Sequence, residues 1–250
     1  MSGHSHWAGI KHKKGAADAK KGRLFSKLAR NITVAARTGG KDPSSNVKLR
    51  YAIEKARAAN MPKDSIERAI KKGTGELPGQ VLEARIYEGY GPGGVAIILE
   101  TLTDNLNRTA AELRHIFEGS GGKLAQRGSV AYMFETKGLF TVRCQDADED
   151  GLMLLAIEAG AENMRRVGDE FEIICRPEDF ERLKQALQEN KILTQVAEIT
   201  QSPKVTVDLD EAQARKVVSL LEALEESEDV QNVYANFSLS DEVYAEVTSS

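Results

Sequence analysis

The chain has 250 residues, of which 41% are hydrophobic and 29% charged, with a formal net charge of −4. This length and hydrophobic content suffice for two or three globular domains with buried cores. No apolar run approaches the roughly 18 residues of a membrane span, and no apolar stretch follows the lysines near the N-terminus, so we expect a cytoplasmic protein without membrane contact. Cys144 and Cys175 are too few for a disulfide framework and indicate two reduced core thiols.

The charge is divided unevenly along the chain. Residues 1–75 hold 18 Lys and Arg against 5 Asp and Glu, a balance of +13, whereas the rest holds 16 against 33, a balance of −17. A concentrated positive field attracts polyanions, of which nucleic acid is the commonest, and an acidic remainder keeps a protein soluble. The alternative is a solvated helical face without a partner.

The N-terminal part predicts an arm and three helices. Residues 1–15 contain three glycines and no hydrophobic period, which is typical of a mobile arm. Apolar residues then recur at spacings of three and four. The predicted helices are 17–37, a second that Asp42 caps and Pro43 begins, and a short third that ends at Gly73. We expect them to surround a small core.

Shorter elements are predicted beyond the linker "GTGELPG". They are strands at 81–88, 94–103 and 129–135, a helix at 107–119, a βαββαβ unit over 137–200, and a last βαβ made of "KVTVDL", a helix at 210–226 and "VQNVYANFSL". The βαββαβ order matches a ferredoxin-like sandwich. The last βαβ could complete a second such sandwich with the βαβ at 94–135.

These elements predict an α+β fold with an N-terminal three-helix domain and two ferredoxin-like α/β sandwich domains, one inserted into the other. The expected domains are 1–78 for the basic arm and helices, 79–135 with 201–250 for a discontinuous α/β domain, and 136–200 for the inserted domain.

The motif "YEGYGPGG" (87–94) is not typical of a phosphate-binding loop. Such a loop runs into a helix whose N-terminal amides face the phosphate, with a lysine and a hydroxyl at fixed offsets. Here the glycines run into Val95–Leu99, a strand pattern without those residues. The motif favours a hairpin turn.

Metal binding and catalysis are the weaker interpretations of the remaining polar residues. A structural zinc site requires four convergent ligands. No cysteine and only distant acids accompany His4, His6 and His12 in the sequence. We therefore predict no metal or cofactor. Glu112 and His115 could act as base and acid of a hydrolase, but no nucleophile with an adjacent base is evident. Helix capping by Asn107 or Thr109 and a domain-interface network are favoured there over an enzyme.

The basic arm and the first helix together predict a clamp for phosphates. Cationic side chains repeat on one side of that helix, opposite its apolar side, although Lys21 breaks the pattern. Six phosphate contacts would give a salt slope of roughly −5 on duplex DNA. Such contacts position a protein without reading sequence. Trp7 is either a platform for a base or a lid on the helical core.

Long collinear motifs make the chain resemble a known family. They are "GHSHW" (3–7), "KHKK" (11–14), "DAKKGRLFSKLAR" (18–30), "NVKLR" (46–50), "NMP" (60–62), "YEGYGPGG" (87–94), "DNLNRT" (104–109), "LRH" (113–115) and "GSVAYMF" (128–134). Nearly end to end, the sequence resembles the YebC/PmpR family, which includes the mitochondrial translational activator of cytochrome oxidase. The resemblance implies a helical N-terminal domain, two α/β domains and no enzymatic activity.

Family members are described as DNA-binding transcriptional regulators, or as ribosome-associated factors that help translation past stretches such as prolines. The resemblance therefore implies a regulator of gene expression whose partner is DNA or ribosomal RNA. We expect a monomer whose acidic α/β domains contact the ribosome or other proteins. The candidate nucleic-acid contacts are His4, Trp7, Lys11, His12, Lys13, Lys14, Lys20, Lys21, Arg23, Lys27 and Arg30.

Overall fold

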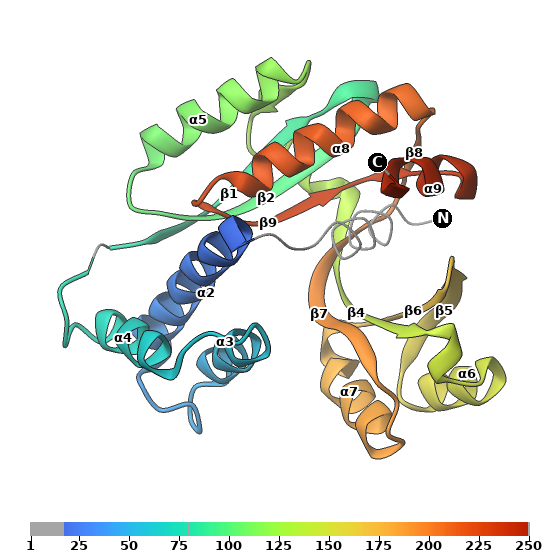
Figure 1. Cartoon of the computed structure of the whole chain (residues 1–250), viewed down its shortest axis with the longest axis horizontal. Helices are drawn as coiled ribbons and strands as arrows, with labels where there is room; N and C mark the ends of the chain where they lie inside the picture. Colours follow the sequence, from blue (N-terminus) through green and yellow to red (C-terminus); the bar gives the residue numbers. More distant parts are fainter. Residues whose placement is uncertain (1–17, 80, 250) are drawn as a thin grey trace.

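A computed structural model describes residues 18–79 and 81–249 of the chain (Figure 1). It confirms the predicted α+β class, with a group of helices beside two four-stranded antiparallel sheets. No helix in the described ranges is both long and apolar enough to cross a bilayer.

From residue 18 onward, where the structure describes the chain, three helices form the N-terminal group, as the sequence predicted. They are α2 (Asp18–Gly39), α3 (Val47–Ala58) and α4 (Lys63–Gly73). Their shared core includes Leu28, Ile32, Leu49, Ile53 and Ile66. The predicted cap of the second helix is wrong. Asn46 caps α3 by accepting a hydrogen bond from the Leu49 amide, because Asp42 is used earlier, in a turn where it accepts from Ser44.

The first sheet has the strand order β3-β1-β2-β9, with α5 and α8 on one face (Figure 1). Its elements are β1 (Glu83–Tyr90), β2 (Ala96–Thr103), α5 (Leu106–Gly119), β3 (Lys123–Ala125), α8 (Glu211–Glu226) and β9 (Val230–Ala235). The core beneath the helices includes Leu99, Leu113, Phe117, Leu220 and Val233. β1 and β2 form the predicted hairpin, closed by the short 3-10 turn Pro92–Gly94, where Gly93 and Gly94 take positive φ.

Two predicted strands of this sheet are wrong. The stretch 129–135 forms a 3-10 turn, Ala131–Met133, and the start of a strand of the other sheet. Two of its apolar residues, Val130 and Phe134, instead cover the face of the first sheet that the helices leave open. The stretch 204–209 forms only β8 (Val207–Asp208), which pairs in parallel with β10 (Phe237–Ser238) outside the main sheet.

The second sheet has the order β5-β6-β4-β7, which is the ferredoxin-like order. Its elements are β4 (Phe134–Arg143), the 3-10 turn Cys144–Asp146, α6 (Glu149–Glu158), β5 (Ala161–Val167), β6 (Glu170–Cys175), the 3-10 turn Pro177–Asp179, α7 (Phe180–Glu189) and β7 (Thr194–Pro203). The chain enters and leaves this sheet through the paired strands β4 and β7. We propose on this basis that 136–200 is an inserted domain. The last element of the chain is α9 (Asp241–Ser249).

Candidate nucleic-acid interface

The structure describes the side chains of only four predicted contacts, Lys21, Arg23, Lys27 and Arg30, all on α2. The contacts predicted at His4, Trp7, Lys11, His12, Lys13 and Lys14 lie outside the described residues, and so does the side chain of Lys20. Lys21 is exposed, and its ammonium lies 5.8 Å from the centre of the Phe25 ring. The other three take part in contacts within the protein.

The cationic side of α2 faces the turn between α8 and β9. We call residues 225–229 of this turn the acidic turn, since four of the five are Glu or Asp. Lys27 Nζ donates to the Glu225 carbonyl oxygen at 2.6 Å, and an Arg23 nitrogen lies 3.5 Å from a Glu226 carboxylate oxygen. These cations therefore help to hold α2 against the first sheet.

Arg30 contacts both the acidic turn and strand β2. Its Nη1 lies 2.6 Å from Asp229 Oδ1, 2.8 Å from the Glu228 carbonyl oxygen and 3.1 Å from the Leu102 carbonyl oxygen. The Asp229 side chain is only 4% exposed, so this is a buried ion pair rather than a surface one. Arg30 is thus a docking residue of the fold.

Asp229 also joins α2 to the start of α5. Its Oδ2 lies 2.9 Å from Arg108 Nη2, 2.7 Å from Thr109 Oγ1 and 3.1 Å from Thr103 Oγ1. With Arg30 these residues form the Asp229 cluster. Burial alone would raise the pKa of Asp229, but the hydrogen bonds from Arg108, Thr109 and Arg30 lower it to about 2.

The cluster explains the motif "DNLNRT". The predicted interface network is present here, but the predicted cap is wrong, because Asn105 caps α5 by accepting from the Arg108 amide. Thr109 is buried in the cluster instead, and Asn107 is exposed. Within the described part of the chain no hydrogen bond or ion pair joins Glu112 to His115.

We expect acid to weaken this docking. The pKa of Asp229 in the folded protein, about 2, lies below the ordinary value of 3.8, so its contribution to stability is complete above that value and is lost as the pH falls toward 2. Wild type should therefore lose more unfolding free energy than an Asp229→Asn variant between about pH 4 and pH 2. Urea unfolding of both proteins across this range measures the difference, and parallel curves would contradict it.

A second contact holds α3 against the ferredoxin-like sheet. Glu54 and Lys184 of α7 approach to 3.7 Å, and Lys55 and Glu198 of β7 to 3.5 Å. The Lys184 ammonium also lies 5.1 Å from the centre of the Tyr51 ring. The N-terminal helices therefore contact both sheets, and part of their charge serves these contacts.

Other cations of the helices have no such partner. Within the described ranges, no hydrogen bond or ion pair is made by the exposed side chains that we call the outer cations, which are Lys48, Arg57, Arg68 and Lys72. An exposed cation without a carboxylate partner leaves its field open to an approaching polyanion. The sequence pattern missed these residues because their spacing does not differ from that of ordinary solvated helix positions.

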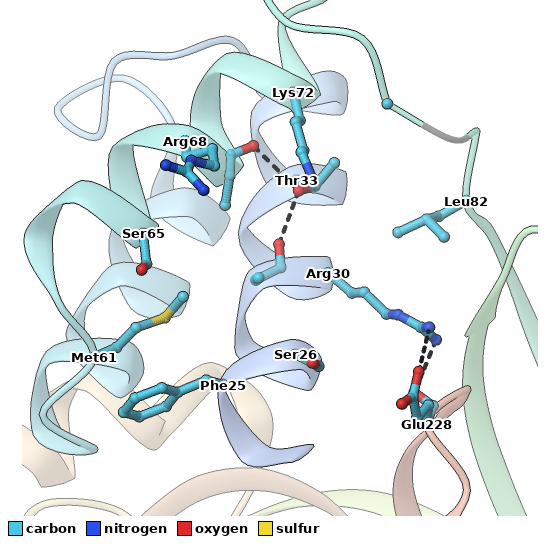
Figure 2. A pocket seen from close by; sticks show the side chains of 13 residues that line it. Phe25, Ser26, Arg30, Thr33, Met61, Ser65, Arg68, Lys72, Leu82 and Glu228 are labelled. Atoms are coloured by element: carbon cyan, nitrogen blue, oxygen red, sulfur yellow. Dashed lines mark hydrogen bonds and ion pairs between the residues drawn. The ribbon is translucent and has the colours of Figure 1, made fainter. Parts of the chain in front are cut away.

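A groove of about 380 Å³ lies between α2 and α4, and two of the outer cations line it (Figure 2). Arg68 and Lys72 stand on α4, while Arg30 on the opposite wall points to Glu228. The Thr33 hydroxyl, which lies 2.8 Å from the Ala29 and 3.1 Å from the Ala69 carbonyl oxygens, ties the two helices together. The walls of the groove are therefore fixed to one another.

The described residues contain no group of three or more His, Cys, Asp or Glu side chains placed to hold a metal ion. The three histidines considered for metal binding lie outside those residues.

A helical N-terminal group with two α/β sheets defines a known class, and the chain belongs to the TACO1/YebC family. Residues 5–76 match the TACO1/YebC protein N-terminal domain, and residues 82–237 match the TACO1/YebC second and third domain. The resemblance inferred from the motifs is thereby confirmed.

Relatives match the chain over almost its whole length. A "Probable transcriptional regulatory protein" of Desulfosudis oleivorans is 55% identical over 243 residues, covering 97% of this chain and 99% of the relative. One of the same name from Desulfatibacillum aliphaticivorans is 53% identical over 246 residues, covering 98% and 100%. The crystal structure of a conserved hypothetical protein, Aq1575 from Aquifex aeolicus, has a TM-score of 0.84 and 49% identity, covering 94% of this chain and 98% of that one.

Proposed function

We propose that the protein is a regulator of gene expression that binds nucleic acid through its basic N-terminal part, without catalysing a reaction. The observation that carries the proposal is the set of outer cations, which have no ion-pair or hydrogen-bond partner among the described residues although other cations of the same helices contact the fold. The balance of +13 over residues 1–75 supports it, and so do the names of the relatives, which are called probable transcriptional regulatory proteins.

The proposal assigns different roles to the basic residues. His4, Trp7, Lys11, His12, Lys13, Lys14, Lys20 and Lys21 remain candidate contacts, and the outer cations join them. Arg23, Lys27 and Arg30 are assigned to docking on the acidic turn, because their charges already have partners there. The polymer that the N-terminal part binds is proposed to be DNA or ribosomal RNA. The acidic α/β domains are proposed to contact other proteins. We propose that the protein is a cytoplasmic monomer.

Removing the outer cations should weaken binding and its salt dependence. A variant with Lys48, Arg57, Arg68 and Lys72 changed to Gln keeps polar side chains at these positions but loses four charges. Because each neutralised phosphate contributes about −0.9 to the slope on duplex DNA, we expect the loss of four such contacts to make the slope shallower by about 3.6. Fluorescence anisotropy with duplex DNA and with ribosomal RNA fragments, from low to moderate salt, measures the change for each polymer.

The matched control removes the same number and kind of charges from the α/β domains. Arg114, Arg143, Lys191 and Lys216 are exposed there, and they are also changed to Gln. The control should keep the affinity and slope of wild type. Equal losses in both variants would show a nonspecific effect of net charge and would contradict the proposal.

A further inference from the structure

The face of α4 that lines the groove changes in chemical character along its length. Ser65, Arg68 and Lys72 lie at spacings of three and four, which places them in one row on α4, and Met61 lies just before that helix begins. Figure 2 shows these groups in order from the Met61 thioether, past the Ser65 hydroxyl, to the two cations, with Phe25 beside Met61. One end of the groove is apolar and aromatic, and the other is cationic.

This sequence of groups corresponds to the parts of a nucleotide. A base presents an apolar face, a sugar presents hydroxyl groups, and a phosphate is anionic. Among the described residues that line the groove, three are cations, and the one carboxylate, that of Glu228, is held by Arg30. An anion therefore meets a net positive wall.

The size of the groove limits what can enter. Its volume, about 380 Å³, lies near the lower end of the range of roughly 300 to 1,000 Å³ that is usual for small-ligand sites. A duplex keeps its bases stacked inside, so only its backbone could reach the rim. An unpaired nucleotide can place its base inside the groove.

We infer that the groove between α2 and α4 binds one unpaired nucleotide of a single-stranded nucleic acid, an inference that rests on the proposed function. The phosphate lies against Arg68 and Lys72, and the base lies against Phe25 and Met61. Single-stranded segments are thereby preferred to a duplex.

The test uses the full chain and a fluorescein-labelled single strand of about 12 nucleotides, as RNA and as DNA, with the duplex of the same sequence. Phe25→Leu should weaken single-strand binding roughly fivefold through the lost ring and leave the duplex affinity unchanged. Arg68→Gln with Lys72→Gln should make the single-strand salt slope shallower by about 1.4. Arg143→Gln with Lys216→Gln removes the same charges elsewhere and should change neither.

Several outcomes separate the inference from the proposed function. If the Arg68 and Lys72 variant loses affinity while Phe25→Leu keeps it, the cations bind phosphates outside the groove, which overturns the inference but not the proposed function. No binding of either polymer by wild type would contradict both. Adenosine monophosphate binding as tightly as the strand would overturn the assignment to a polymer.

A second measurement uses wild type alone, so it tests the inference even if the Phe25→Leu variant does not fold. A single strand that contains 4-thiouridine is photocrosslinked to wild type, and the attached peptides are mapped by mass spectrometry. The inference predicts attachment at Phe25 or Met61. Attachment confined to other segments would overturn it.

Discussion

Replacing Asp229 by alanine is expected to lower the free energy of unfolding by about 3 kcal/mol, at the low end of the cost of breaking a buried ion pair. The change removes the acceptor shared by Arg30, Arg108 and two threonine hydroxyls. The cost stays at the low end because the Arg108 side chain is 50% exposed and can be hydrated. Urea unfolding followed by circular dichroism measures this loss of unfolding free energy. The backbone amides of α2 should also exchange their hydrogens faster in the variant than in wild type.

Asp104→Ala is the matched control for that variant. Asp104 also contacts Arg108, at 2.8 Å, but its ion pair lies at the surface. Its loss should cost less than about 1 kcal/mol. If Asp229→Ala were no more destabilising than this control, the Asp229 cluster would not hold the N-terminal helices to the first sheet.

Replacing Glu88 by alanine is the second large effect, with an expected loss of about 2 to 3 kcal/mol of unfolding free energy. The Glu88 carboxylate is buried and accepts hydrogen bonds from the amides of Gly128, Val130 and Ala131 at 2.6, 2.7 and 2.9 Å. Burial would raise the pKa of Glu88, but these three bonds lower it overall. Without the Glu88 carboxylate, the buried amide of Val130 has lost its hydrogen-bond acceptor, which destabilises the folded protein.

Glu83→Ala, on the same strand, is the control for Glu88→Ala. Glu83 is exposed and lies 3.8 Å from Arg85, so its removal should change stability by less than about 0.5 kcal/mol. Thermal unfolding of both variants measures the difference. Hydrogen exchange of the Val130 amide should rise only in the Glu88 variant, and unchanged protection there would contradict the role given to this carboxylate.

Local patterns in the sequence predicted the helices well, because a buried helical stripe leaves a spacing of three and four that the chain itself shows. A contact between residues that are distant in the sequence leaves no such local pattern. The apolar run 130–134 fits a strand, yet Val130 and Phe134 cover the open face of the first sheet. Asn46 was missed as a cap because Asp42 and Pro43 also fit a helix start.

The candidate site shows the same limit. The cationic row on α2 was predicted from its spacing, but nothing local indicated that it meets the acidic turn. A charge count treats all cations alike. The fold separates Arg30, which is paired with a buried carboxylate, from Arg68 and Lys72, which pair with no carboxylate of the described part of the chain. The groove needs two helices brought together by tertiary packing, which periodicity does not describe.

Ultraviolet crosslinking of the protein to nucleic acid in cells, followed by mass spectrometry of the attached peptides, tests whether the N-terminal part binds nucleic acid. Crosslinked peptides are expected within residues 1–78, including the segment of α4 that carries Arg68 and Lys72. Sequencing of the attached polymer would show whether it is DNA or ribosomal RNA. Crosslinks found only beyond residue 78, or none at all, would contradict binding through the N-terminal part.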